Sequence, residues 1–107
     1  MNKNYCVIGT GRQGTAAAYD LLKYADINNL LLLDNNQASI DQCLRKINSV
    51  KSNINIITSI IDFNDIDDLK NKLNPVDIFL SSVPYKYNLM LTQVALDTSC
   101  SMVDLGG

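Results

Sequence analysis

The sequence contains no histidine, so it lacks the side chain that most often acts as a general base or metal ligand. It also has no long hydrophobic run, and no apolar stretch approaches the ~18 residues of a membrane span. The apolar run Cys6–Ile8 is too short for a signal peptide, and glycine follows it at once. The 9 basic and 11 acidic residues leave a net charge of −2, which indicates neither a nucleic-acid nor a membrane partner.

Cysteine is scarce as well, with only Cys6, Cys43 and Cys100 scattered along the chain. An odd, widely spaced set of this kind predicts reduced thiols of a cytoplasmic protein, not disulfides, a redox pair or a metal site. The 107 residues fit one domain, and a hydrophobic content of 47% is sufficient for a core of its own.

What the sequence does contain is a glycine-rich turn between a predicted strand and a predicted helix. Residues 5–14 read Tyr-Cys-Val-Ile-Gly-Thr-Gly-Arg-Gln-Gly, which places Gly9, Gly11 and Gly14 in the pattern G-x-G-x-x-G. Asp34 closes the next apolar run, 20 positions after the last of these glycines. The strand, the glycines, the helix and the acid together match the dinucleotide-binding fingerprint. An ordinary turn that binds no nucleotide is the alternative.

Each part of this fingerprint has a physical role. Gly9 lets the chain turn tightly, Gly11 allows a pyrophosphate to approach the backbone, and Gly14 lets the helix pack close to the strands. The phosphates then meet the free N–H groups at the positive end of the helix. Asp34 is placed to accept hydrogen bonds from the adenosine ribose.

Strands and helices are expected to alternate through the rest of the chain. We expect strands at 4–8, 29–34, 54–60, 76–81 and 102–105, and helices at 12–24, 38–48, 65–73 and 85–98. This alternation predicts an α/β fold with a Rossmann-type doubly wound parallel sheet of order 3-2-1-4-5, lacking a sixth strand. The bare fifth strand leads us to expect that residues 1–107 are the N-terminal part of a longer enzyme.

Two local details accompany this assignment. The first helix is expected to pack through Ala16, Ala17, Leu21 and Leu22. Asn64 or Asp62 is expected to cap the third helix.

A second informative segment lies where the fourth strand ends. Small residues, Ser81 and Ser82, are followed by Pro84, which begins the next helix. The fourth strand neighbours the first across the topological switch point, so its carboxyl end borders the nicotinamide side of the crevice. An ordinary strand-to-helix turn with proline at the first helical position is the competing interpretation.

Three segments together resemble the N-terminal nucleotide-binding domain of the saccharopine dehydrogenase family. They are Val7–Gly14, Ser82–Asn88 (with Pro-Tyr-x-Tyr-Asn) and Met102–Gly107 (with Val-Asp-Leu-Gly-Gly). The resemblance spans essentially all of this chain but only the first part of such enzymes. It implies hydride transfer between NAD or NADP and a carbon–nitrogen bond of an amino-acid or imine substrate, with a substrate domain downstream and a possible homodimer.

The resemblance also implies roles for particular residues. It assigns the pyrophosphate to Gly9, Thr10, Gly11, Arg12, Gln13 and Gly14. It assigns the ribose to Asp34 with Asn35 beside it, the adenine to Asp62, and the nicotinamide ribose to Ser82, Val83 and Pro84. Asp62 is alternatively only a helix cap, Tyr85 and Asn88 alternatively pack against the missing domain, and Asp104 is given a structural role.

The same residues bear on cofactor choice and catalysis. Asp34 would repel a 2′-phosphate and no basic residue follows it in 35–37, so we predict NAD over NADP, although Arg12 could reach a phosphate. Lys86 is the only titratable amine near the expected hydride site, and it alternatively faces solvent. We therefore expect the catalytic residues to lie outside this chain. The chain by itself would bind the cofactor without turnover.

Two other functions fit parts of the pattern. NAD(H)-sensing regulatory domains of potassium transporters share the glycine pattern and the acid but lack the Pro-Tyr-x-Tyr-Asn and Val-Asp-Leu-Gly-Gly segments. Oxidoreductases acting on sugars or dihydrodipicolinate share the strand-to-proline arrangement, but they usually carry a histidine in the following helix, and this chain has none.

Overall fold

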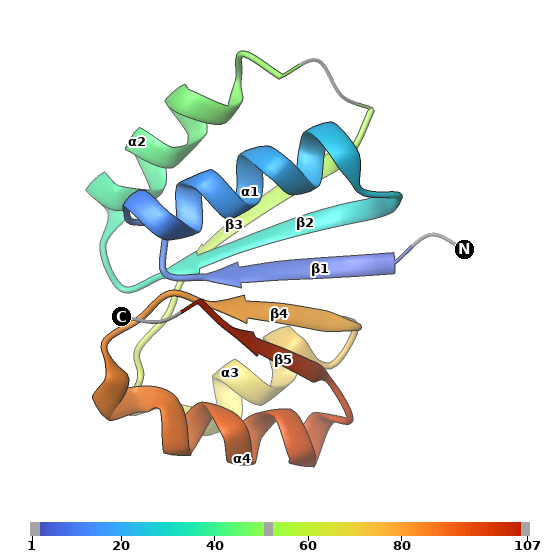
Figure 1. Cartoon of the computed structure of the whole chain (residues 1–107). Helices are drawn as coiled ribbons and strands as arrows, with labels where there is room; N and C mark the ends of the chain where they lie inside the picture. The colour runs from blue at the N-terminus through green and yellow to red at the C-terminus, as the bar shows by residue number, and fades with distance from the viewer. Residues whose placement is uncertain (1–2, 51–52, 106–107) are drawn as a thin grey trace.

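Five parallel strands form one sheet in the order β3-β2-β1-β4-β5, with helices on both faces (Figure 1). The computed structural model describes residues 3–50 and 53–105, so Gly106 and Gly107 of the third resembling segment lie outside the described residues. The elements in chain order are β1 (Lys3–Ile8), α1 (Arg12–Tyr24), β2 (Ile27–Asp34), α2 (Gln37–Ile47), β3 (Asn55–Ile60), α3 (Ile66–Leu73), β4 (Ile78–Ser81), the 3₁₀ turn η1 (Tyr85–Tyr87), α4 (Asn88–Thr98) and β5 (Ser101–Asp104). The predicted fold class and strand order are confirmed.

The sheet separates two hydrophobic cores. Helices α1 and α2 cover one face, and α3 and α4 cover the other (Figure 1). Alternate residues of β1 enter opposite cores: Val7 packs with α1 and α2, whereas Cys6 and Ile8 pack with α3 and α4. Burial on both faces explains why the central strands are continuous apolar runs, as in the four leucines of β2.

The expected boundaries shift by small amounts. Strand β2 begins at Ile27, two residues earlier than expected, and β4 begins at Ile78 instead of Val76. The last helix is divided: η1 follows Pro84, and the regular α-helix starts only at Asn88. The Tyr87 N–H donates to the Pro84 carbonyl at 3.0 Å, which tightens this turn.

The packing face of α1 is the expected one only in part: Leu22 is buried and Leu21 packs against the same core. Ala16 is exposed and Ala17 only half-buried, and the buried residues of this helix are Gly14, Thr15, Ala18 and Leu22. The Thr15 hydroxyl donates to the Thr10 carbonyl at 3.0 Å, so the side of the helix that faces the glycine-rich turn is set by contacts within the turn.

The cap of α3 is Asp65, not Asn64 or Asp62, and its carboxylate accepts the Asp68 N–H at 3.1 Å. Asp62 instead accepts the Asn64 N–H at 2.9 Å within the turn that follows β3. Both are Asx-type contacts, in which a short carboxylate binds a backbone N–H two or three residues ahead.

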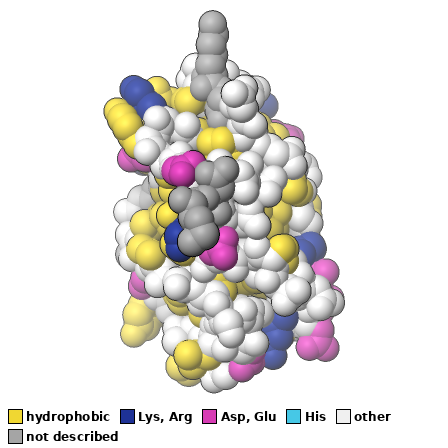
Figure 2. Space-filling view, turned by 90° about the vertical axis from the view of Figure 1, so that its right-hand side faces the viewer, with side chains coloured by type: hydrophobic (Ala, Val, Ile, Leu, Met, Phe, Trp, Pro, Cys, Tyr) yellow, Lys and Arg dark blue, Asp and Glu magenta, His cyan; other side chains and the backbone are white. Residues whose placement is uncertain are grey.

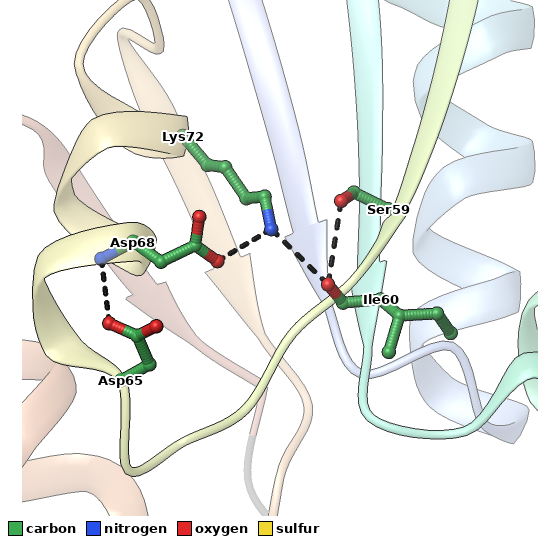
Figure 3. Close-up of polar contacts among 5 residues, drawn as sticks. All are labelled: Ser59, Ile60, Asp65, Asp68 and Lys72. Carbon is green, nitrogen blue, oxygen red and sulfur yellow. Dashed lines mark hydrogen bonds and ion pairs between the residues drawn. The ribbon is translucent and has the colours of Figure 1, made fainter.

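A lysine ties α3 to the end of β3 (Figure 3). Lys72 donates to the Ile60 carbonyl at 3.2 Å and pairs with Asp68 at 2.6 Å, one helical turn earlier. These contacts hold α3 against the end of β3, so the turn between them lies at the carboxyl edge of the sheet.

The end of the molecule at which the strands begin carries an interspersed surface of hydrophobic and charged side chains (Figure 2). A hollow of about 370 Å³ lies at this end, lined in part by Asn4, Tyr5 and Pro75. It is remote from the glycine-rich turn, which is at the strands' carboxyl ends. No helix within residues 3–50 and 53–105 is long and apolar enough to cross a membrane.

Candidate cofactor-binding cleft

The turn after β1 requires glycine at its first position. Gly9 has φ = +93°, and its N–H donates to the Leu33 carbonyl of β2 at 2.7 Å. A Cβ atom here would lie 2.6 Å from the Ser82 carbonyl oxygen on the opposite side. The turn is therefore wedged between the ends of β2 and β4, and both the positive φ and the lack of space exclude a side chain.

The other two glycines meet opposite surroundings. A Cβ at Gly14 would lie only 1.8 Å from the Gly9 carbonyl oxygen, so this glycine permits the close contact of α1 with the turn. A Cβ at Gly11 would meet no heavy atom of the described chain within 4 Å. The close contact bears out the packing predicted for Gly14, whereas ligand approach at Gly11 stays a prediction for which the chain leaves space.

The N-terminus of α1 faces this open space without a competing side chain. Gly11 is the N-cap, no described side chain caps the helix there, and its first turn has no acidic residue. The Gly11 carbonyl accepts the Thr15 N–H at 2.8 Å, and this is the first hydrogen bond of the helix. Uncapped N–H groups and the positive helix end fit a phosphate at this point.

Asp34 lies at the end of β2, beside the glycine-rich turn, and is bonded to it. One carboxylate oxygen accepts both the Thr10 N–H at 2.7 Å and the Thr10 hydroxyl at 2.8 Å. The other oxygen accepts the Asn36 N–H at 3.1 Å. Three of the roughly four lone-pair sites of the carboxylate are thus used, and the oxygen bonded to Asn36 can accept one further donor. Asp34 can therefore hold the turn and still accept a ribose hydroxyl.

The turn after β4 forms the other wall. The Ser82 N–H donates to the Ile8 carbonyl at 2.8 Å, which extends the contact between β4 and β1 by one residue. A cavity of about 270 Å³ lies between the walls, lined by Gly9, Gly11, Asp34, Asn35, Ser39, Phe63, Ser82, Val83, Pro84, Lys86 and Tyr87. Seven of the twelve residues expected to bind cofactor thus meet in one cleft.

The remaining five expected residues do not line this cavity. Thr10 and Gly14 are buried behind it, where they support Asp34 and α1. Arg12 lines a separate hollow on the α1–α2 surface, beside Tyr19 and Lys46. Gln13 and Asp62 are exposed and lie outside the lining of the cleft.

Four lining residues were not predicted as cofactor ligands: Ser39, Phe63, Lys86 and Tyr87. The rings of Phe63 and Tyr87 stack with centroids 4.3 Å apart and an interplanar angle of 15°. This stack joins the turn after β3 to the turn after β4. Phe63 directly follows Asp62, and Tyr87 belongs to the Pro-Tyr-x-Tyr-Asn segment, so their positions carried a partial signal.

Asp104 has the structural contact expected of it. The Asn88 amide donates to its carboxylate at 3.0 Å, which links the first turn of α4 to the end of β5. This contact holds the start of α4 beside β5.

The cysteines are free and buried, as expected of core thiols. Burial raises the pKa of Cys6 well above its usual value and raises that of Cys100 to about 11. A protonated buried thiol is a poor nucleophile and metal ligand. Among the described residues, no cluster of acidic or cysteine side chains is suited to a metal ion.

Comparison with known families adds a further finding. A family model described as the saccharopine dehydrogenase NADP-binding domain matches residues 5–106. The match covers all three segments on which the resemblance rests, short of the final glycine.

Solved structures share the fold at low sequence identity. Apo saccharopine dehydrogenase (L-Glu forming) from Saccharomyces cerevisiae superposes with a TM-score of 0.76 at 20% identity, covering 99% of this chain and 22% of that one. Pen from Bacillus thuringiensis gives 0.77 at 16% identity, with 96% and 37% coverage. Shikimate dehydrogenase from Mycobacterium tuberculosis gives 0.70 at 10% identity, with 97% and 46% coverage. This chain therefore spans less than half the length of each of these proteins.

Proposed function

The chain belongs to the saccharopine dehydrogenase NADP-binding domain family, and from this premise we propose that it is the cofactor-binding part of an amino-acid dehydrogenase. In this proposal the enzyme transfers a hydride at a carbon–nitrogen bond of an amino-acid or imine substrate. The observation that carries the proposal is the cleft in which the glycine-rich turn, Asp34 and the Ser82–Pro84 turn face one cavity. A nicotinamide dinucleotide bound there supplies the hydride acceptor or donor.

The chain's own residues bind and orient the cofactor. The N-terminus of α1 takes the pyrophosphate, where the open space at Gly11 lets the backbone approach it. Asp34 accepts an adenosine ribose hydroxyl while Thr10 holds its carboxylate in place. Ser82, Val83 and Pro84 border the nicotinamide ribose. Only three of the described lining residues, Asp34, Lys86 and Tyr87, carry acidic or basic side chains, and this scarcity supports a catalytic group outside this chain.

We further propose NAD as the preferred cofactor, although the family's name mentions NADP. The 2′-phosphate of NADP would lie beside the Asp34 carboxylate, and two neighbouring negative charges repel each other. Arg12, the residue that could have offset this, lines the other hollow. Lys86 is the one described lysine or arginine in the cleft, and it comes from the turn after β4.

The partners of this domain follow from the same proposal. A substrate domain would lie beyond Gly107 in the polypeptide, which the 22–46% coverage of the compared proteins supports. We also propose that the longer protein forms a homodimer and lies in the cytoplasm. The three free, buried thiols support the location. Sequencing the coding region beyond Gly107 tests the first point, because an immediate stop codon would contradict it.

Asp34 tests the cofactor assignment. Replacing Asp34→Ala removes the ribose acceptor, so we expect about tenfold weaker NADH binding and a narrower gap between NADH and NADPH. Titration followed by NADH fluorescence measures both affinities. Asp41→Ala is the matched control, because it removes a carboxylate from α2 that is outside the cleft lining.

Asp34→Ala also removes three hydrogen bonds from the turn, so circular dichroism must show that the variant is folded. Asp34→Asn is a second variant that keeps one oxygen for Thr10 while removing the charge. Unchanged affinities for both cofactors in these folded variants would refute the assignment of Asp34.

A further inference from the structure

The described lining of the cleft contains few charged side chains, and the lysine among them suggests how the cleft could bind an anionic ligand. Among the described residues lining the cavity, Asp34 is the only carboxylate and Lys86 the only cation. The carboxylate already accepts three hydrogen bonds from Thr10 and Asn36. Within the described part of the chain, Lys86 forms no ion pair, so its charge is free to meet a ligand.

Lys86 is held at the cleft by its neighbours. Its ammonium nitrogen lies 5.1 Å from the centroid of the Tyr87 ring, within the range of a cation–π contact. The Tyr87 ring in turn stacks on Phe63, and the backbone N–H of Tyr87 donates to the Pro84 carbonyl. The lysine therefore stands on a turn that is fixed by the stack and by proline, although its own side chain is exposed to solvent.

The ligand of this cleft carries one negative charge on each phosphate of its pyrophosphate. The N-terminus of α1 supplies only about half an elementary charge through its dipole. Arg12 is the first residue of α1, but its side chain lines the hollow with Tyr19 and Lys46. The helix dipole thus offsets only part of the pyrophosphate charge, and among the described lining residues Lys86 is the one cation that can add to it.

We propose that Lys86 binds the pyrophosphate of the dinucleotide, together with the N-terminus of α1. This assignment rests on the proposed function of the cleft and goes beyond it by naming a side chain of the β4–α4 turn as a phosphate ligand. The ammonium is a compact point charge that can reach either phosphate without a fixed geometry. Ligands that share the pyrophosphate should depend on Lys86 equally, whatever they carry at the 2′ position.

Binding by the whole chain tests this. We expect Lys86→Gln to weaken binding of NADH, NADPH and ADP-ribose alike, by about three- to tenfold at low salt, and to leave adenosine binding unchanged. Lys86→Arg keeps the charge and should restore the affinity. The difference between Lys86→Gln and the unsubstituted chain should shrink as salt is raised.

Lys23→Gln is the matched control. The Lys23 ammonium also lies over tyrosine rings, 5.7 Å from Tyr19 and 5.4 Å from Tyr24. It is near the far end of α1, roughly 17 Å along the helix from the cleft. Its loss should leave all four affinities unchanged, while altering net charge as Lys86→Gln does.

The outcomes separate this assignment from the proposed function. If the unsubstituted chain binds NADH and ADP-ribose but Lys86→Gln behaves like the control, the lysine assignment alone fails. A loss confined to NADPH would place the ammonium at the 2′-phosphate, and an equal loss for adenosine would show damage to the cleft's shape; either overturns it. If the unsubstituted chain binds none of these ligands, the proposed function fails and this assignment with it.

Discussion

Alanine at Gly11 and at Gly14 should have opposite consequences, although the two substitutions are chemically identical. At Gly14 the new methyl carbon would start 1.8 Å from the Gly9 carbonyl oxygen, whereas real Cβ contacts are essentially never under 3.0 Å. The obstructing atom belongs to backbone, and Gly9 itself is held at φ = +93° by neighbours on both sides. Neither partner can move aside alone, so α1 must shift away from the sheet.

The magnitude follows from the kind of clash. Overpacking a core commonly costs about 1–3 kcal/mol, and a rigid backbone neighbour puts Gly14→Ala at about 3 kcal/mol or more. That is a large fraction of the roughly 5–15 kcal/mol by which domains are stable. Gly11→Ala meets no described atom within 4 Å and loses only a favourable N-cap residue, for about 1 kcal/mol.

For cofactor binding, we expect the substitution at Gly11, which costs little stability, to be the harmful one. The methyl group of Gly11→Ala occupies the space through which the pyrophosphate approaches the backbone, so we expect at least about tenfold weaker NADH binding in a fully folded variant. Gly11→Ser should weaken binding similarly while restoring the N-cap and its stability. Urea denaturation followed by circular dichroism measures stability, and NADH fluorescence titration measures affinity.

This reasoning would be refuted by a Gly11→Ala variant that binds NADH as tightly as the unsubstituted chain. The close packing at Gly14 would be refuted if Gly14→Ala unfolded at the same urea concentration as the unsubstituted chain.

Two further predictions concern the core and the wall of the cleft. Phe63→Leu removes the stack on Tyr87 but keeps an apolar side chain, so we expect the free energy of unfolding, measured by urea denaturation, to fall by about 1 kcal/mol. Tyr87→Leu should lower it by the same amount. Additive losses in the double variant would show that the rings do not interact. Burial raises the pKa of Cys6 and Cys100, so these thiols ionise at lower pH in the unfolded chain than in the folded one. The free energy of unfolding should therefore be constant below pH 9.0 and decline from there toward pH 11. Urea midpoints measured across this range should fall, and less so in Cys100→Ala; a constant midpoint would contradict the raised pKa values.

Much of the fold was predictable because its signals are local. The alternation of apolar strands with helices of 3.6-residue period predicts parallel strands, and the handedness of crossovers then selects the order β3-β2-β1-β4-β5. The positions of Gly9 and Gly14 were readable for a similar reason, since each relieves a steric conflict within a few residues or against an adjacent strand.

The packing face of α1 was predicted only in part: Leu22 is buried and Leu21 packs against the same core, as expected, but Ala16 is exposed. Helical spacing alone is compatible with more than one apolar face. The helix buries Gly14, Thr15 and Ala18 because its first turn must touch the turn after β1. Ala16 satisfies the composition of a packing face but points to solvent. The same contacts place Arg12 in the hollow outside the cleft.

By itself, the sequence determined the order of the strands, the glycine-rich turn and the acidic residue at the end of β2. Only the tertiary structure decided that Phe63 and Tyr87, 24 positions apart, stack across the carboxyl edge of the sheet, and that Lys86 joins Asp34 in one cavity. The physical reason is that local patterns encode backbone direction, whereas the direction of a side chain depends on the packing of segments that meet only after the sheet has formed.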